Sequence, residues 1–464
     1  MRADLLAGPV DGLDEALDAV DTFDRALVGG LLRPQAAADA DGLTRLAGAV
    51  VGTPLATRVA EAAAKASAGT ADEDHFVALA AARTALLGSV HDALLTLVEA
   101  AAGRPRGASA APAADGQPTV NLLNAARAWL SDLARCGWQG LDHEVVSGAA
   151  EVVSAMLPDP SLRRLATLLD GFAAELAASC PGASTERFPV RRWADLWSRG
   201  MLLTVPGAAG TPVTGTADGR LLPLGIDVQE HATAAQAQVH AVFEPADGSA
   251  SRLVRASVSV PKPDTVLGAG IWQLLRPHMS LLAAAGEGRS MVLTGMPVTA
   301  EGDLVWSDEH ARPGEPAEAF ATARVALPTA TAPVTAPLDR HPARIAVPVF
   351  LEGYTARTDD DGVLTFTVAG LDLVVDTDRI PVAGPLTPET AAKSGACIAL
   401  IRWDAGTFAV QPLAVETTVR KKVTSVHAGA WAGGTTDKAG ARAEKAATDA
   451  ATVLSERAGR LLRK

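Results

Sequence analysis

The hydrophobic pattern of this 464-residue chain changes its period near residue 200. Before that point, apolar residues recur at three- and four-residue spacing in an alanine-rich background, as they do over Leu13–Leu32. Beyond it, short runs of valine, threonine and leucine alternate with polar residues and are separated by turn residues. A helical period followed by a strand period requires two different hydrophobic cores. The pattern therefore predicts an α+β multidomain protein, with an N-terminal alanine-rich helical bundle and C-terminal, mostly antiparallel β units.

Composition and turn residues divide each half of the chain further. A low-complexity stretch covers 103–118, and prolines concentrate in 309–343. Such stretches usually connect packed units. In chain order we expect a helical block at 1–102, a linker at 103–118, a second helical block at 119–200, a β-rich unit with one helix at 201–308, a proline-rich connector at 309–343, a small β barrel or sandwich at 344–419, and a basic tail with a terminal amphipathic helix at 420–464.

One apolar segment, Phe76–Val98, must be tested as a membrane span. Arg83, His91 and Asp92 interrupt it, and charged residues are costly in the middle of a bilayer. The segment is therefore predicted to be a buried helix, and no membrane partner is expected. The N-terminus becomes acidic at Asp4 and lacks a long apolar core, so we expect no signal peptide.

The three cysteines, Cys136, Cys180 and Cys397, lie far apart in the sequence. The chain contains no CxxC pair and no His/Cys spacing typical of a metal site. Buried, reduced thiols are typical of cytoplasmic proteins. We therefore expect a cytoplasmic protein without a metal or another cofactor.

The net charge of −12 is distributed unevenly. Residues 1–200 carry a net charge of −8, residues 201–419 carry −10, and residues 420–464 carry +6. An acidic body argues against broad contact with nucleic acid, with the basic tail as the exception. That tail is either a solvated face or a surface that binds an acidic partner or phosphates. Its basic patch consists of Arg420, Lys421, Lys422, Arg457, Arg460, Arg463 and Lys464.

Aromatic and basic residues coincide at the change of period, in the segment Phe188–Thr204. Trp193 and Trp197 are four residues apart, so they share one face of the predicted helix. Their flanking residues include Arg191, Arg192 and Arg199. Tryptophan and arginine are enriched where proteins bind each other. The helix is therefore interpreted either as an anchor between the helical and β halves or as a docking surface for a partner.

The stretch RRWADLWSRGMLL, from Arg191 to Leu203, resembles a group of uncharacterised bacterial proteins. These proteins are encoded beside SWIM zinc-finger proteins, MoxR-type AAA+ ATPases and von Willebrand A domain proteins. The resemblance implies a companion of an ATPase system, with an AAA+ ATPase or a von Willebrand A domain protein as its partner. It implies no catalytic residue, and the SWIM cysteine/histidine pattern does not occur in this sequence.

The sequence lacks the motifs that most often identify an enzyme. It contains no GxxxxGK[ST] phosphate loop, no HExxH zinc motif and no GxSxG nucleophile motif. One acidic cluster has the spacing of a strand face, since Asp372, Asp376 and Asp378 are all even-numbered. Carboxylates on one face could bind a divalent cation or act as acid and base. The same spacing also suits a solvated strand.

Three functions are compatible with these patterns. The leading hypothesis is a non-catalytic adaptor that binds other proteins, because linkers and a Trp/Arg helix occur without a catalytic motif. The alternative is a nucleic-acid-binding protein that uses an OB-like C-terminal β unit and the basic tail. The third is a divalent-cation-dependent enzyme that uses the aspartate cluster.

Overall fold

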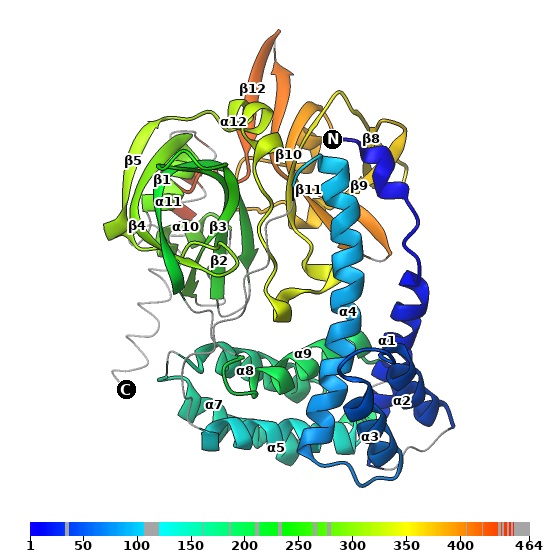
Figure 1. The fold of residues 1–464 in the computed structure, drawn as a ribbon. Helices are drawn as coiled ribbons and strands as arrows, with labels where there is room; N and C mark the ends of the chain where they lie inside the picture. Colours follow the sequence, from blue (N-terminus) through cyan, green and yellow to red (C-terminus); the bar gives the residue numbers. More distant parts are fainter. Residues whose placement is uncertain are drawn as a thin grey trace.

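Helices fill the chain up to Leu203, and strands dominate from Val213 onward. This confirms the predicted α+β architecture, which Figure 1 shows as a helical layer beneath two β units. The computed structural model describes residues 1–32, 37–105, 120–159, 161–184, 187–208, 213–230, 234–262, 266, 268–275, 280–404, 406–419, 421–434, 438, 440–442, 445–446 and 449.

The helices on both sides of the expected linker build one hydrophobic core. Phe23, Leu79, Leu130 and Trp197 are buried together in it. The two predicted helical blocks therefore pack as one unit, although residues 106–119 between them lie outside the described residues. Its helices are α1 (Leu13–Gly29), α2 (Ala37–Ala49), α3 (Ala56–Ser67), α4 (Glu73–Ala102), α5 (Val120–Cys136), α6 (His143–Ser147), α7 (Ala149–Met156), α8 (Arg163–Ala178) and α9 (Val190–Leu203).

Helix α4 is the long apolar segment singled out in the sequence. It starts after Asp72, whose carboxylate accepts a hydrogen bond from the backbone N–H of His75 at 3.1 Å, and it stops at Gly103 in a left-handed conformation. It is the one described helix long and apolar enough to cross a membrane, yet half of its most apolar stretch is buried in the protein. Arg83 and His91 are also buried. These contacts confirm the prediction of a buried helix.

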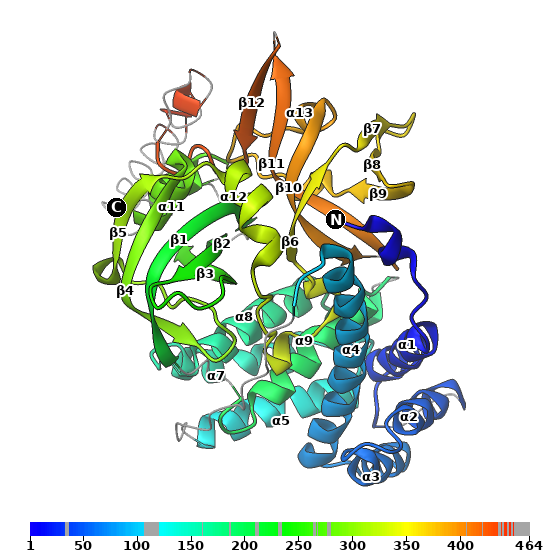
Figure 2. The ribbon, with the colours of Figure 1, turned by 45° about the horizontal axis from the view of Figure 1, so that its top comes forward.

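The two halves of α4 belong to different cores. Phe76 and Leu79 pack in the helical core, whereas Leu94 and Val98 pack beneath the second β unit. The first turn of the chain, the 3₁₀ helix η1 (Ala3–Ala7), joins that second core as well. Helix α4 therefore connects the helical layer to the β half, as the upright helix in Figures 1 and 2.

The first β unit is a five-stranded antiparallel sheet in the order β3-β2-β1-β4-β5. One face, with Leu221 and Phe243, packs against two short helices, α10 (Gly270–Leu275) and α11 (Ser280–Glu287). The opposite face presents Val242 towards the second sheet. The alternation of neighbouring residues between faces explains why both faces are apolar here. The strands are β1 (Val213–Glu230), β2 (Ala234–Pro245), β3 (Arg252–Pro261), β4 (Arg289–Thr299) and β5 (Ala311–Pro316).

The second β unit is a seven-stranded sheet in the order β6-β10-β11-β9-β8-β7, with β12 paired to β11. Of the two predicted alternatives, a small barrel or a sandwich, the barrel is wrong for the described residues, because β6 and β7 end the order instead of pairing with each other. All pairings are antiparallel except the one between β9 and β11. The strands are β6 (Val347–Glu352), β7 (Thr355–Thr358), β8 (Leu364–Val368), β9 (Leu371–Val375), β10 (Ser394–Asp404), β11 (Thr407–Val419) and β12 (Lys422–His427).

The two sheets pack on each other through β1 and β11. Gly225 lets them approach closely, since a Cβ atom at this position would lie only 2.7 Å from the Cβ of Leu413. Helix α12 (Ala319–Val325) covers the remaining apolar contact with Phe320. This part of the interface is filled by a cluster of buried apolar side chains: Leu222, Leu224, Val242, Leu253, Phe320, Ile398 and Ala414.

The expected proline-rich connector has structure of its own. It includes β5, α12 and the 3₁₀ turns η5 (Leu327–Thr329), η6 (Pro337–Asp339) and η7 (Pro342–Arg344). The turns η6 and η7 pass between the helical layer and the β units, as the yellow segment in Figure 1. They bring basic residues to the surface of the helical core.

Part of the chain that was predicted to be a basic tail is a strand in the structure. Residues 422–427, which we assigned to the basic tail, form the edge strand β12. Most of the predicted terminal helix lies outside the described residues. All three cysteines are unpaired, with Cys397 buried and the other two half-buried. Burial raises the pKa of the Cys136 thiol to about 11, which keeps it protonated.

Candidate functional site

The tryptophans of α9 belong to the helical core. Trp193 lies 5.0 Å from Trp138 between ring centroids, and Trp197 donates a hydrogen bond through Nε1 to the carbonyl of Leu130 at 2.8 Å. Both side chains are at most 1% exposed. They anchor α9 to the other helices, so neither ring contacts the β half or is accessible to a partner.

The opposite face of α9 forms one wall of a groove of about 1020 Å³. Helices α4 and α8, the segment from η6 to η7, and Gln236 and Ser259 of the first sheet form the rest of its lining. The acidic member of that lining is Asp195, and His341 is its one histidine. We call this feature the arginine groove, because eight arginines line it: Arg83, Arg163, Arg164, Arg191, Arg192, Arg199, Arg340 and Arg344.

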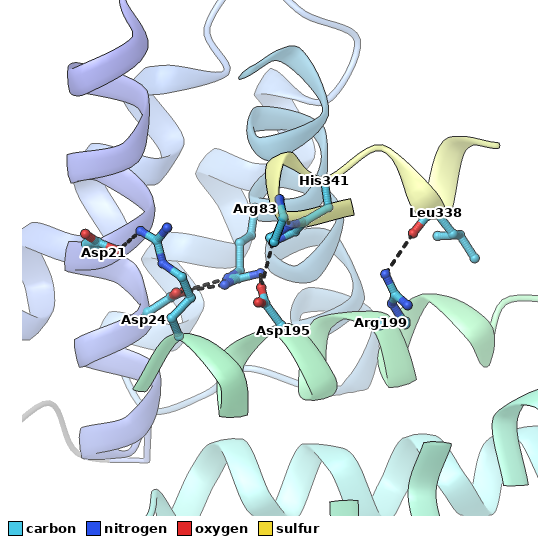
Figure 3. A network of polar contacts seen from close by, with 9 residues as sticks. Asp21, Asp24, Arg83, Asp195, Arg199, Leu338 and His341 are labelled. Atoms are coloured by element: carbon cyan, nitrogen blue, oxygen red, sulfur yellow. Dashed lines mark hydrogen bonds and ion pairs between the residues drawn. The ribbon is translucent and has the colours of Figure 1, made fainter. Parts of the chain in front are cut away.

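A chain of buried and half-buried polar side chains forms the floor of the arginine groove (Figure 3). Arg83 donates to both carboxylate oxygens of Asp24, at 2.6 and 2.7 Å, and its remaining nitrogen lies 2.7 Å from Asp195. His341 Nε2 lies 3.2 Å from the same Asp195 carboxylate. These contacts join α1, α4, α9 and η7 in one network. A fully buried guanidinium between two carboxylates fixes the relative positions of these four elements.

Burial and charge act in opposite directions on the groups of this floor. Burial alone would raise the pKa of Asp195, but the hydrogen bond from His341 and the charge of Arg83 lower it to about 2. Burial likewise opposes the charge of Arg83, but the two carboxylates raise its pKa above the ordinary value. Both groups are therefore charged at neutral pH.

Two arginines at the start of α9 are held over the groove by neighbouring helices. Arg191 forms an ion pair with Asp21 of α1. Arg192 forms one with Glu175 of α8, with Nε 2.9 Å from Oε2. Their side chains stay 40% and 60% exposed, respectively, so guanidinium N–H groups remain accessible to a ligand.

The end of the proline-rich connector, around η6 and η7, forms the wall of the arginine groove that faces α9. Asp339 accepts from Arg164 of α8 at 3.2 Å and from Arg344 at 2.7 Å. Arg199 donates to the carbonyl oxygen of Leu338 at 3.3 Å, and burial lowers its pKa. A carbonyl does not neutralise a guanidinium, so Arg199 adds positive charge to the groove. This arrangement repels metal cations and attracts carboxylates and phosphates.

The sequence-predicted residues divide into three groups. Arg191, Arg192 and Arg199 line the groove, while Trp193 and Trp197 lie behind it. Of the basic patch, Lys421 and Lys422 lie at the start of β12, far from α9 in both Figures 1 and 2. Its other members, Arg420, Arg457, Arg460, Arg463 and Lys464, lie outside the described residues.

The aspartate cluster is dispersed among local partners. Asp372 accepts a hydrogen bond from Thr367 Oγ1 at 2.6 Å, and Asp376 accepts one from Arg379 Nε at 2.8 Å. Throughout the described ranges, no group of three or more His, Cys, Asp or Glu side chains is placed to hold a metal ion. The geometry therefore gives the cation-dependent hypothesis no site at Asp378 or its neighbours.

Sequence reasoning missed half of the groove. Arg83 was noticed only as a charge that breaks an apolar segment, and a buried arginine in such a helix requires carboxylate partners. That requirement could have pointed to Asp195, the acidic residue between the two tryptophans. The run DRHPAR, Asp339–Arg344, is a second signal, since Asp339 accepts a hydrogen bond from α8 and His341 contacts Asp195 of α9.

No protein-family model, no curated protein sequence and no solved structure matches this chain. The resemblance of the α9 segment to companions of AAA+ ATPases therefore stays a prediction.

Proposed function

We propose that this protein is a non-catalytic adaptor that binds an acidic segment of another protein in the arginine groove. The observation that carries the proposal is the concentration of eight arginines on one groove of a chain whose net charge is −12. Apart from the basic tail at 420–464, the rest of the chain is acidic and repels an acidic partner, so within residues 1–419 attraction is focused on this groove. The charge pattern thus gives both affinity and a single orientation.

The ion pairs that the arginines already form suit reversible binding of a protein partner. Those at the rim already have carboxylate partners, so exchanging Glu175 for a ligand carboxylate at Arg192 costs little. Guanidinium groups bind carboxylates in a bidentate geometry, and several in a row recognise an acidic sequence. The buried Arg83 pair holds the helices that carry them in a fixed arrangement. We therefore expect moderate affinity with strong dependence on salt.

Both single-stranded nucleic acid and an acidic protein segment carry the charge that such a groove attracts. The residues that line the groove favour the protein segment. Binding of single-stranded nucleic acid normally uses aromatic rings on which bases stack. The described lining of the groove contains no aromatic ring apart from His341, because Trp193 and Trp197 face the core. The partner implied by the α9 resemblance is an AAA+ ATPase or a von Willebrand A domain protein, and an acidic segment of such a protein is the ligand we propose.

Fluorescence anisotropy with a labelled glutamate-rich peptide tests this function. The groove variant is R163E/R192E, since both side chains are exposed and neither is buried in the helical core. The matched control is R220E/R357E, which reverses two exposed arginines on the β units. We expect at least tenfold weaker peptide binding by the groove variant, and unchanged binding by the control.

A labelled oligonucleotide of equal charge provides the comparison with nucleic acid. Tighter binding of the oligonucleotide than of the peptide, lost in R163E/R192E, would replace the adaptor with a nucleic-acid-binding protein. Peptide binding that is equal in the groove variant and in the control would overturn the assignment of the groove.

A further inference from the structure

A second hollow, of about 760 Å³, lies between the helical layer and the two sheets. Helix α4 contributes Leu95, and β10 contributes Arg402. The face of the first sheet that is turned away from α10 and α11 contributes Gln236 and His240. We call it the inner cavity. It adjoins the arginine groove, since Arg164 lines both. Its size suits a small molecule, because ligand pockets commonly measure about 300–1,000 Å³.

His240 is the most unusual group in the wall of the inner cavity. Its side chain is fully buried, and neither ring nitrogen has a hydrogen-bond partner in the described protein. It lies on β2 opposite Gly225 of β1 and Arg255 of β3. An unpaired polar group in a protein interior costs about 1–3 kcal/mol. Because this unpaired group also lines a cavity, it is a candidate contact for a ligand.

The imidazole is uncharged. Burial lowers the pKa of His240 to about 3, although the carboxylate of Asp227 opposes this shift. A neutral imidazole offers one N–H donor and one acceptor nitrogen. Its natural complement is a group that also donates and accepts, such as a hydroxyl.

The charged side chains around His240 are already paired. Arg255 donates to both oxygens of Asp303, at 2.8 and 2.7 Å. Arg402 donates to Asp227 at 3.0 Å. A ligand with a net charge would be left uncompensated in such a charge-balanced wall, whereas an uncharged polar ligand would not. The two arginines beside the ring also disfavour a metal cation.

The polar wall is also held in place before any ligand arrives. Gln411 accepts from Arg402 at 2.6 Å and donates to Asp227 at 2.7 Å, so three buried side chains from β1, β10 and β11 form a closed network. Such fixed polar side chains reduce the ordering cost of binding. Gln236 and Gln238 extend the same face of β2 with carboxamides that both donate and accept.

We propose that the inner cavity binds a small, uncharged polyhydroxyl compound, of the size of a mono- or disaccharide, with a hydroxyl group on the ring nitrogens of His240. This site is distinct from the proposed adaptor site, because its ligand differs and because His240 and Arg402 line the inner cavity alone. Arg164, Gln236, Ala343 and Arg344 line both the cavity and the arginine groove. The ligand would bridge the helical layer and both sheets.

Calorimetry and saturation-transfer NMR on the full chain test the site. The probes are glucose, galactose, maltose and myo-inositol, with inorganic phosphate and acetate as charged comparisons. We expect at least one of the uncharged probes to bind, and H240L to weaken that binding at least tenfold. Q236L, a change at a half-buried residue, provides a second loss of affinity that does not depend on the folding of H240L. R192E changes the groove only and should leave binding unchanged.

Three results would overturn the proposal. They are the absence of binding by every uncharged probe, binding that persists in both H240L and Q236L, and binding of phosphate or acetate that depends on His240. The last result would assign the cavity to an anion. None of them touches the adaptor function, which is measured with the acidic peptide and the variant R163E/R192E.

Discussion

The arginine groove and the inner cavity are neighbours that share Arg164, Gln236, Ala343 and Arg344, yet they are built differently. In the groove, rim side chains such as Arg192 are exposed and hold ion pairs that a ligand can exchange. In the cavity, His240 is buried and unpaired beside charges that are closed into pairs. In our proposals, this difference in exposure and pairing selects the ligand. The exposed, arginine-rich surface binds an acidic segment, and the buried, charge-balanced wall binds a small uncharged molecule.

Removal of the buried arginine is expected to have the largest effect. The variant R83M leaves Asp24 and Asp195 without their shared cation, and breaking a buried ion pair costs about 3–5 kcal/mol of stability. Urea unfolding of R83M measures this loss. The control is R45A, whose ion pairs with Asp18 and Asp41 are exposed and should contribute less than about 1 kcal/mol. Equal effects of the two changes would show that the floor of the groove is not a structural element.

His240 in the inner cavity and Asp195 in the arginine groove should reduce the stability of the fold in different pH ranges. The pKa of His240 is about 3 in the folded chain against an ordinary 6.5. As pH falls below 6.5, the unfolded chain binds a proton that the folded chain does not, so stability decreases by at most about 1.4 kcal/mol per pH unit for this group. The loss continues down to about pH 3. Urea unfolding between pH 7 and pH 4 should show a shallower loss in H240L, and an unchanged slope would contradict the buried, neutral histidine.

The groove has its own window at lower pH. The pKa of Asp195 is about 2 against an ordinary 3.8, so its stabilisation is present above pH 4 and is lost as pH falls from 4 towards 2. The variant D195N removes this titration while it keeps a side chain of similar shape. We expect its stability to fall less steeply than that of the parent chain below pH 4. A parallel decline would mean that the carboxylate does not bind Arg83 and His341 in solution.

The smallest stability effect is expected at the rim. The variant R192A loses an exposed ion pair with Glu175, which contributes at most about 1 kcal/mol. Its thermal unfolding midpoint should therefore stay close to that of the parent chain, although it weakens binding of the acidic peptide. A stability loss as large as that of R83M would show that the rim arginines serve the fold instead of a ligand.

The sequence predicted those features that depend on neighbours along the chain. The spacing of Trp193 and Trp197 predicted one shared face of α9, and the apolar run around Arg83 predicted a buried helix. The sites depend on contacts between distant residues. Arg83 and Asp195 are 112 positions apart, and Arg402 and Asp227 are 175 positions apart. No local pattern encodes such pairs, because they arise only when separate elements pack.

The same limit applies to the burial of His240 and to the open second sheet. Alternation along β2 puts His240 on the same face as Val242, but only the packing of the second sheet buries that face. Strand spacing in 344–419 suggested a barrel or a sandwich, and spacing does not determine whether β6 and β7 pair. The order of strands in a sheet depends on tertiary contacts that the hydrophobic period does not contain.

Site-specific photo-crosslinking in cells tests the central claim most directly. A photoreactive residue at Thr167, inside the arginine groove, is compared with one at Val374, which is exposed on the second sheet. We predict that crosslinks from Thr167 map to acidic segments of partner proteins and disappear when R163E and R192E are added. Crosslinks that map to segments without acidic residues, or that are as frequent from Val374, would contradict the proposed function.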